Sequence, residues 1–321
     1  MANHYQFSEL FHRYDRNPIL TANQWPYPVN SVFNAGAAKL DGETLLLVRA
    51  EDRKGFSHLT VARSRDGFGG WVIDREPTFP ASPQTHPEEM YGIEDPRLTW
   101  LEERNCWAIT YTAFSDAGPL VSLAWTEDFR TFHRLGPVMP PEDKDAALFP
   151  VRFQDRWAML HRPVATLATT GAHIWISFSP DLKHWGDHRV LLPARRGGWW
   201  DARKIGLSPP PLETPEGWLI LYHGVRTTAA GCLYRLGLAL LDRNDPTRVL
   251  RRSSQWVFGP RETYELEGDV PGVVFPCGWV VEDDEVRLYY GAADSSIALA
   301  TASLKDLLRF VLESPPGDGS Q

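Results

Sequence analysis

A strand-turn-strand unit recurs along this chain of 321 residues: an apolar strand, a short turn, a second alternating strand and an acidic turn. The five copies begin at Leu45, Trp107, Trp157, Trp218 and Val286, so they follow one another every 50 to 68 residues. A period of this size, filled with short strands, is typical of the blades of a β-propeller. The repeat therefore predicts an all-β fold with five blades. A pair of β-sandwiches is the alternative.

The regions outside the repeat complete this picture. Residues 304–312 have apolar side chains at helical spacing and predict one short C-terminal helix. The Pro/Gly/Ser-rich tail, residues 314–321, is expected to be disordered. Residues up to about 30 are expected to wrap the disc or to complete the last blade, as ring closure requires. No linker interrupts the repeat, so residues 1–313 are predicted to form a single domain.

Charge and composition exclude several classes of partner. The net charge of −8 and the pI near 5.7 argue against nucleic acid and against an anionic membrane surface. No run approaches the roughly 20 apolar residues of a membrane span, and the N-terminus lacks a signal pattern, so we expect a cytoplasmic protein. Cys106, Cys232 and Cys277 lack metal-ligand spacing, which predicts buried thiols and no metal site. The 13 Trp residues suit sugar rings.

The stretch 91–97, Tyr-Gly-Ile-Glu-Asp-Pro-Arg, is the strongest local candidate for chemistry. Pro96 disfavours the helical region for Asp95 and favours an extended backbone there. The apolar run 98–101 follows and is interpreted as a strand, so the acids are expected on a rigid turn at a strand entrance. An acid that must be aimed suits such a position. The alternative is that Asp95 caps a turn and has Arg97 as its surface partner.

Polar side chains end the first strand of each repeat. If these strands are the innermost strands of the blades, their ends meet at the central axis. Burying so many ionisable groups is unfavourable unless they are paired or meet a ligand. The mixture of cations, acids and aromatic rings favours a sugar subsite beside an anion subsite, although a strand-end Arg or His taken alone more often makes a structural hydrogen bond. The residues are Arg49, Glu51, Tyr111, His161, Arg162, Tyr222, His223, Tyr290 and Asp294.

A set of short motifs occurs in a fixed order along nearly the whole chain, from residue 32 to residue 294. The chain resembles glycoside hydrolase family 130, the β-mannoside phosphorylases and related mannosidases, whose fold is a five-bladed propeller. The motifs are Val32-Phe-Asn-Ala-Gly36, Gly92-Ile-Glu-Asp-Pro-Arg97, Lys144-Asp-Ala-Ala-Leu-Phe-Pro150, His161-Arg-Pro163, Lys204-Ile-Gly206, Gly217-Trp-Leu-Ile-Leu-Tyr-His-Gly224, Val273-Val-Phe-Pro276 and Tyr289-Tyr-Gly-Ala-Ala-Asp294.

The resemblance implies an inverting β-mannoside phosphorylase that releases mannose 1-phosphate. In that reaction Asp95 is the proton donor, acting through a hydroxyl of the bound mannose, while phosphate attacks the anomeric carbon from the opposite face. It implies phosphate ligands at Lys144, Arg162 and His223, with Arg49 as a fourth. Asn34, Asp201 and Asp294, together with Tyr290 at its strand end, are expected to hold the mannosyl ring. Inorganic phosphate is the co-substrate and no cofactor is implied; a homo-oligomer stays open.

Two other functions remain. The strand 118–124 lacks the Arg that many family phosphorylases carry just before it, which leaves room for an inverting β-mannosidase. Its base would be a glutamate from another loop, with Glu51, Glu265 and Glu267 as candidates. A sugar-binding propeller without catalysis would need the Trp residues but not Asp95. The segment 52–64 resembles the members that act on β-1,2-mannosides.

Overall fold

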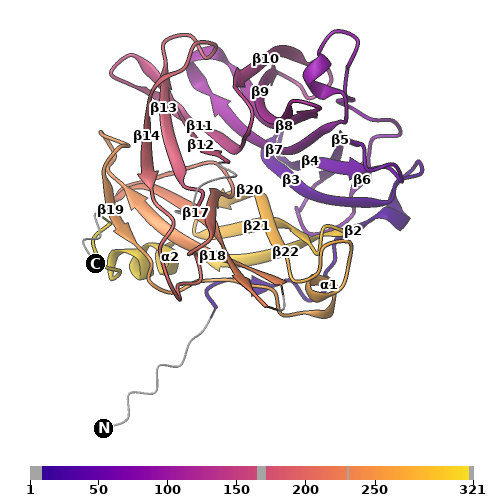
Figure 1. Cartoon of the computed structure of the whole chain (residues 1–321). Helices are drawn as coiled ribbons and strands as arrows, with labels where there is room; N and C mark the ends of the chain where they lie inside the picture. The colour runs from indigo at the N-terminus through magenta and orange to yellow at the C-terminus, as the bar shows by residue number, and fades with distance from the viewer. Residues whose placement is uncertain (1–8, 165–170, 230, 318–321) are drawn as a thin grey trace.

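The computed structural model describes residues 9–164, 171–229 and 231–317, and these residues form five β-sheets arranged around one axis (Figure 1). Each sheet contains one of the five predicted repeats, so the predicted five-bladed propeller is confirmed. Blades 1 to 3 consist of β3 (Ser31–Leu40), β4 (Glu43–Glu51), β5 (Ser57–Ser64) and β6 (Val72–Ile73); β7 (Ile93–Leu101), β8 (Cys106–Ser115), β9 (Gly118–Thr126) and β10 (His133–Met139); and β11 (Asp143–Phe153), β12 (Arg156–Pro163), β13 (Ile174–Ser179) and β14 (Gly186–Leu192).

Blades 4 and 5 each carry an additional short strand. Blade 4 has β15 (Lys204–Leu207), β17 (Gly217–Thr228), β18 (Gly231–Leu241) and β19 (Val249–Arg252), with β16 (Leu212–Thr214) paired to β17. Blade 5 has β20 (Val274–Glu282), β21 (Glu285–Ala292), β22 (Ser296–Ser303) and β1 (His12–Arg13), with β2 (Leu20–Thr21) paired to β22. The described helices are α1 (Thr263–Leu266), α2 (Leu304–Leu312) and three 3₁₀ turns, Ala22–Gln24, Pro87–Glu89 and Glu102–Arg104.

The innermost strands are not the ones predicted from the repeat. The strands with polar ends are β4, β8, β12, β17 and β21, and each is the second strand of its sheet. The inner positions belong to the preceding strands, β3, β7, β11, β15 and β20, several of which contact one another across the ring. These strands include polar and irregular segments such as residues 94–97, so hydrophobic periodicity alone does not identify them.

Apolar layers lie between every pair of neighbouring blades. Leu45 and Leu47 of blade 1 pack against blade 2, whereas Leu46 and Val48 pack against blade 5, and all four are at most 1% exposed. Corresponding layers join blades 2 and 3, blades 3 and 4, and blades 4 and 5. Because both faces of a blade are covered, its central strands are apolar on both sides, as the near-continuous runs of the repeat require.

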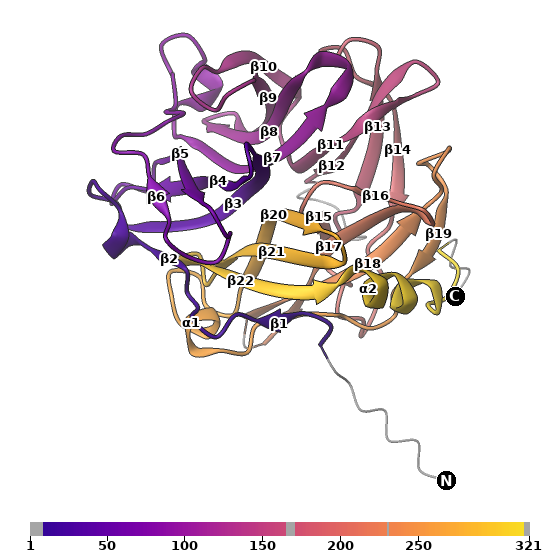
Figure 2. The same cartoon turned by 180° about the vertical axis from the view of Figure 1, so that it is seen from behind.

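The N-terminal segment completes the last blade, which is one of the two arrangements expected from the sequence. β1 and β2 both pair antiparallel with β22, so the first described strand lies at the outer edge of the final sheet (Figure 2). Arg13 of β1 also donates two hydrogen bonds to the carboxylate of Glu265 in α1, at 2.8 and 2.9 Å. The ring is therefore closed by strand pairing and by a buried ion pair.

The C-terminal helix has the predicted bounds, 304–312. Its N-cap Ser303 accepts a hydrogen bond from the backbone of Asp306, and Leu307 and Val311 are buried. The tail differs from the expectation of disorder: Gly317 donates its N–H to the Leu250 carbonyl, which places residues 314–317 along β19. The rest of the expected tail, residues 318–321, lies outside the described residues, as do residues 1–8.

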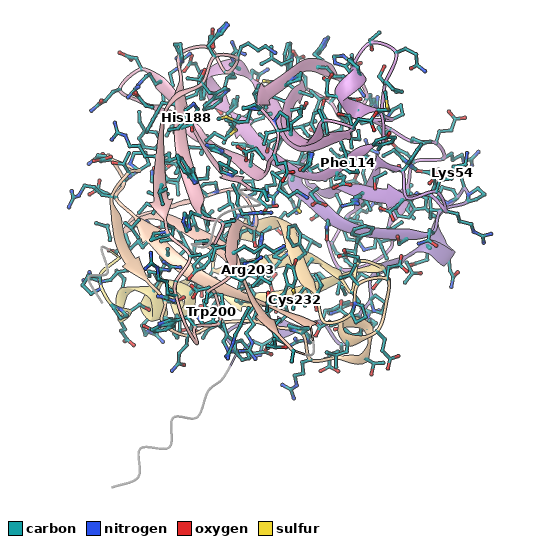
Figure 3. The ribbon with its side chains drawn as sticks, in the orientation of Figure 1. Lys54, Phe114, His188, Trp200, Arg203 and Cys232 are labelled. Carbon is teal, nitrogen blue, oxygen red and sulfur yellow. The ribbon has the colours of Figure 1, made fainter. Side chains whose placement is uncertain are left out.

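Two further observations concern the thiols and the membrane. Cys106 and Cys277 are buried as expected, but Cys232 is exposed, because it lies near the tip of the β17–β18 hairpin rather than between blades (Figure 3). Within the described part of the chain, no helix has the length and apolar character that crossing a membrane requires.

Candidate active site

Asp95 lies within β7, at a β-bulge, rather than on a turn before the strand. The pairing of β7 with β8 shifts between Glu94 and Arg97, and Asp95 has φ +51°, which is left-handed rather than extended. Asp is one of the few residue types that tolerates this conformation. The bulge re-aims a side chain that would otherwise follow the strict alternation of the strand, and Asp95 is 6% exposed.

The same irregularity occurs on the inner strands of the two flanking blades. Asn34 on β3 has φ +48° and Asp145 on β11 has φ +55°, each at a shift in strand register. Asn34 Nδ2 donates to Asp95 Oδ1 at 2.9 Å. Three consecutive blades therefore present a polar side chain from an equivalent bulge, and the first two of these side chains are in contact.

Arg49 connects the acids around Asp95. Its Nη1 lies 3.0 Å from Asp95 Oδ1, and its Nη2 lies 2.9 Å from Glu51 Oε2 and 3.1 Å from Glu94 Oε1. Burial opposes the charge of the guanidinium, but the three carboxylates outweigh it and raise the pKa of Arg49. Glu51, one of the candidate hydrolytic bases, is thus an acceptor of Arg49 in this arrangement.

The charge state of Asp95 follows from these neighbours. Burial by itself raises the pKa of a carboxyl group, but Arg49, the amide of Asn34, Lys144 and Arg97 together hold the pKa of Asp95 below its usual value. Asp95 is therefore ionised at neutral pH when the site contains no ligand.

A second acidic centre lies at Asp145. Its Oδ2 accepts from Arg162 Nε at 2.7 Å and lies 3.4 Å from His223 Nε2, and its Oδ1 lies 3.5 Å from Arg97 Nη2. Burial opposes ionisation, but Arg162, His223 and Arg97 keep the pKa of Asp145 well below the usual value. Burial likewise lowers the pKa of His223, although Asp145 opposes this change. The structure thus brings Arg162 and His223 together on one buried carboxylate.

Arg97 is not a surface partner of Asp95. It is 1% exposed, and it donates to the backbone carbonyls of Leu207 at 2.9 Å and Ser208 at 2.6 Å in blade 4. Its Nη1 also lies 3.2 Å from the Asp95 carbonyl. Arg97 therefore fixes the Asp95 bulge against the far side of the ring.

Cationic donor groups without an acceptor lie beside the two acids. Among the described residues, Lys144 and Lys204 form no ion pair, and the terminal amino groups of Arg162 have no hydrogen-bond acceptor. The positive charge of Lys144 helps to lower the pKa of Asp95. The pKa of Lys204 is also lowered, mainly by burial and then by the nearby charge of Arg162. Cations that are close together and have donor groups to spare form a site for an anion.

Asp294 differs from the other acids. It follows β21 with φ +49° and, among the described residues, makes no hydrogen bond or ion pair. Burial, together with the charges of Asp95, Glu51 and Glu94, raises the pKa of Asp294 to about 7, although Arg49 opposes this. Asp294 is thus a half-buried carboxyl group, on the Arg49 side of the site, that exchanges its proton near neutral pH.

Two predicted substrate ligands are not brought to this centre. Tyr290 is fully buried between blades 4 and 5, and its hydroxyl donates to Glu265 at 2.7 Å. Asp201 is also fully buried and accepts from Arg195, Arg252 and Tyr222 at 2.8 to 3.0 Å. Tyr290 thus supports the packing of blade 5 against blade 4, and Asp201 ties the loop before β15 to β17 and β19 of blade 4.

Close packing around the polar groups requires glycine at two positions. A Cβ atom on Gly206 would lie 2.2 Å from Asp145 Oδ2 and 2.5 Å from His223 Cε1. A Cβ atom on Gly291 would lie 2.0 Å from Asn34 Oδ1. These contacts explain why glycine occurs in the motifs 204–206 and 289–294: it allows a neighbouring strand to approach the polar side chains closely.

An aromatic rim, formed by Phe56, Tyr91 and Phe114, adjoins the acids. The ring centroids of Tyr91 lie 5.9 Å from Phe56 and 5.8 Å from Phe114, and Phe56 and Phe114 are about 40% exposed. Ser57, which follows Phe56, pairs with Gly92 and accepts from Arg49 Nε at 2.9 Å. Phe114 lies in blade 2, across the ring from Cys232 in this view (Figure 3). Exposed rings beside polar groups suit stacking against a sugar.

Comparison with known proteins identifies the family. A family model described as β-1,4-mannooligosaccharide phosphorylase matches residues 10–313, nearly the whole chain. The chain belongs to glycoside hydrolase family 130. Its family 130 relatives include the β-1,4-mannooligosaccharide phosphorylase of Ruminococcus albus, which is 32% identical over 94% of this chain and 91% of the relative.

Solved structures of family 130 have the same fold. The β-1,2-mannobiose phosphorylase of Listeria innocua, in complex with β-1,2-mannobiose, has a TM-score of 0.86 and 30% identity over 94% of this chain and 99% of that one. A second structure, at TM-score 0.81 and 25% identity over 98% of both chains, comes from work stating that this family of mannoside phosphorylases contains glycoside hydrolases that target β-1,2 mannosidic linkages in Candida mannan.

Asp145 and Lys204 were not among the site residues predicted for this family 130 chain. The sequence does carry a signal for Asp145, because an Asn or Asp occupies the same bulge position in the inner strands of blades 1, 2 and 3. Lys204 lies in the motif Lys204-Ile-Gly206, but no charge pattern within the motif distinguishes it from a surface lysine. In both cases the strand that carries the residue was not recognised as an inner strand.

Proposed function

We propose that this family 130 chain is an inverting β-mannoside phosphorylase that converts a β-mannoside and inorganic phosphate into mannose 1-phosphate and a shortened sugar. The observation that carries the proposal is a group of cationic donors that have no acceptor among the described residues: Lys144 beside Asp95, and Lys204 and the terminal amino groups of Arg162 beside Asp145. Phosphate is itself a nucleophile and needs cations to hold it rather than a second carboxylate as base.

In the proposed reaction, phosphate binds to these cations and an oxygen of phosphate attacks the anomeric carbon from the face opposite the leaving sugar. The glycosidic bond breaks, its electron pair goes to the leaving oxygen, and Asp95 supplies a proton to that oxygen through a mannose hydroxyl. Asp95 is ionised in the unliganded site, but bound phosphate offsets the cations that lower its pKa. Phosphate binding thus favours the protonated form that a general acid requires.

The remaining residues match this division of the site. Asn34 and Arg49 orient Asp95, Asp145 holds Arg162 and His223 in place, and Asp294 is available to a mannose hydroxyl. The aromatic rim suits the leaving sugar. We propose β-1,2-mannobiose as the first substrate, since segment 52–64 resembles the β-1,2 members and the Listeria innocua enzyme is a mannobiose phosphorylase. We place the reaction in the cytoplasm, where phosphate is supplied and a charged product is retained.

The decisive experiment measures mannobiose turnover with and without phosphate. We expect mannose 1-phosphate as the product and no turnover in phosphate-free buffer. Arg162→Ala should weaken transition-state stabilisation by about 2 to 4 kcal/mol, roughly 30- to 1,000-fold in kcat/KM for phosphate, with mannobiose binding nearly unchanged. Arg156→Ala, on the same strand but paired with the exposed Asp187, is the control and should keep wild-type kinetics.

An inverting β-mannosidase is the second candidate, favoured by the raised pKa and the unpaired state of Asp294. Such a carboxyl group could activate water in place of phosphate. Of the bases considered from sequence, Glu265 is buried against Arg13, whereas Glu267 is exposed beyond α1. Release of free mannose at a rate independent of added phosphate would establish hydrolysis and reject the phosphorylase.

A further inference from the structure

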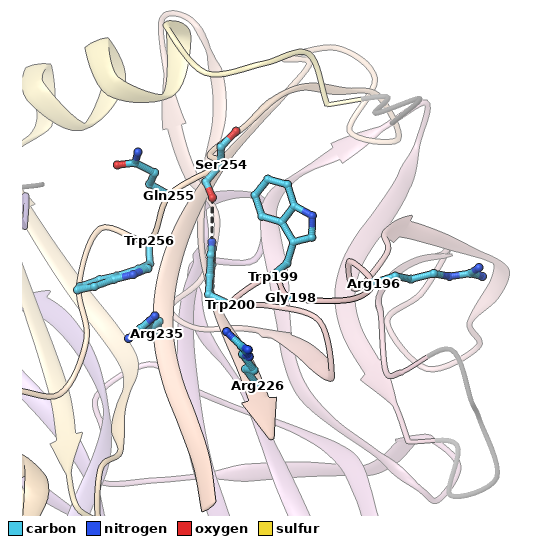
Figure 4. Close-up of a pocket in the computed structure, with 9 residues that line it drawn as sticks. All are labelled: Arg196, Gly198, Trp199, Trp200, Arg226, Arg235, Ser254, Gln255 and Trp256. Carbon is cyan, nitrogen blue, oxygen red and sulfur yellow. Dashed lines mark hydrogen bonds between the residues drawn. The ribbon is translucent and has the colours of Figure 1, made fainter. Parts of the chain in front are cut away.

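A cavity of about 520 Å³ lies beside the β17–β18 hairpin of blade 4, and we call it the outer cavity. It is lined by four residues of the loop before β15, by Arg226 and Arg235 of the hairpin, and by residues 254–256 after β19; the four are Arg196, Gly198, Trp199 and Trp200 (Figure 4). Arg226 is three positions after His223 on β17, and side chains alternate along a strand. This outer cavity is therefore on the opposite face of β17 from the His223 side chain.

The charge of the outer cavity is unbalanced. Three arginines, Arg196, Arg226 and Arg235, line it together with no acidic residue, in a protein whose net charge is −8. Among the residues that the structure describes, none of the three guanidinium groups forms an ion pair or a side-chain hydrogen bond. Burial and the nearby charge of Arg226 lower the pKa of Arg235. Like charges held together without a counter-charge favour an anionic ligand.

Aromatic rings give the cavity a second kind of contact. Trp199 is 41% exposed, and its neighbour Trp200 is fixed by a hydrogen bond from its Nε1 to the Ser254 carbonyl at 3.0 Å. Arg235 lies 4.5 Å from the ring centroid of Trp256. Figure 4 shows Arg226 and Arg235 next to one another beside these indoles, whereas Arg196 extends away at the margin. Arg195 lies 4.4 Å from the ring centroid of Trp199, and the exposed part of that indole suits stacking against the apolar face of a sugar ring.

We propose that the outer cavity is a second, non-catalytic site that binds an anionic monosaccharide, such as a sugar phosphate or a uronate. The pyranose ring stacks on Trp199, and Arg226 and Arg235 bind the phosphate or carboxylate. The cavity volume suits one such ligand. The site uses none of the residues around Asp95, so it goes beyond the proposed phosphorolysis. Mannose 1-phosphate, the product of that reaction, belongs to the class of ligand that it accepts.

Calorimetric titration of the full chain with mannose 1-phosphate, without acceptor sugar, tests this site. We expect two binding sites per chain. The double variant Arg226→Gln/Arg235→Gln should lose one of them, with binding there weakened about tenfold or more, while mannobiose phosphorolysis is retained. Arg162→Ala should lose the other. Arg65→Gln, at an exposed position on blade 1, is the control and should keep both sites.

Further ligands identify the chemistry that is recognised. Glucuronate should bind to the wild-type chain and lose its binding in the double variant if the anionic ring is the shared feature, whereas binding of mannose 1-phosphate alone indicates a site for phosphate. Neutral mannose, which has no anionic group, should not bind in the outer cavity. An unchanged stoichiometry and affinity for mannose 1-phosphate in the folded double variant would overturn the proposal. One site that is lost in the double variant and kept in Arg162→Ala would support the outer cavity while contradicting the proposed function.

Discussion

Asp95 combines burial, a left-handed backbone and two hydrogen bonds to one carboxylate oxygen. Asn tolerates the same backbone conformation, so Asp95→Asn removes the proton without removing the geometry. We expect the variant to fold and to bind mannobiose, but to turn over on the order of a hundredfold or more slowly. Steady-state kinetics and circular dichroism check this. Asp41→Asn, an exposed turn residue that also has φ +51°, is the control. Near-normal turnover in Asp95→Asn would remove Asp95 from the mechanism.

Asp294 makes folding stability depend on pH. Its pKa is raised from 3.8 to about 7 in the folded chain, so between these values the folded state keeps a proton that the unfolded state releases. Stability contributed by this group therefore falls as pH rises from about 4 to 7, and the loss is complete above pH 7. Asp294→Asn should increase the free energy of unfolding by about 1 to 4 kcal/mol at pH 8 and leave it nearly unchanged at pH 4.

Urea unfolding at several pH values measures the effect of Asp294→Asn. The matched control is Asp283→Asn, an exposed residue of the same blade with φ +53°, which should give a difference that does not vary with pH. A variant of Asp294 that is destabilised at pH 8 would show that the carboxylate has a stabilising partner in solution.

At the scale of single elements, three bulged inner strands and their close neighbours build the site. Gly206 on β15 lets that strand pass against Asp145 and His223, and an added Cβ would lie 2.2 Å from the Asp145 carboxylate. We expect Gly206→Ala to cost about 1 to 3 kcal/mol of stability and to raise the KM for phosphate, because Asp145 and His223 must move. Thermal unfolding and kinetics measure both effects.

Gly186→Ala is the matched control for Gly206→Ala. Gly186 begins β14, and a Cβ atom there would meet nothing within 4 Å. Its stability should change by less than about 1 kcal/mol, with the phosphate KM unchanged. Equal behaviour of the two variants would mean that the inner strand shifts freely and that Gly206 does not position the phosphate ligands.

At the scale of the whole molecule, stability depends on closure of the ring. Each blade buries both faces against its neighbours, and the apolar layer between blades 5 and 1 includes Ile19, Leu20 and Trp25 of the N-terminal segment, whose strands pair with β22. Arg13→Ala leaves the buried Glu265 carboxylate without its guanidinium, and we expect a loss of about 3 kcal/mol in the free energy of unfolding. Arg16→Ala, at an exposed position of the same segment, should change it little. Equal stability of the two variants would show that strand pairing alone closes the ring.

Local sequence determined the architecture of this protein. Apolar strands and turns are encoded in short segments, so the five-fold repeat, the C-terminal helix and the closing role of the N-terminus were all predicted. The candidate acid was also found locally, because Asp95 stands next to a proline in a polar stretch that leads into a strand. Contacts between blades could not be predicted in this way, because they join residues far apart in the chain.

Tertiary structure alone decided which strand is innermost and which face each polar side chain occupies. A bulge shifts the register by one residue and so exchanges the two faces of a strand, which is how Asp95, Asn34 and Asp145 come to project together. Tyr290 was predicted from its motif and strand position and Asp201 from the family resemblance, but their side chains are held by Glu265 and Arg252, which come from distant segments. Such contacts join residues that are far apart in the sequence, so no local pattern encodes them.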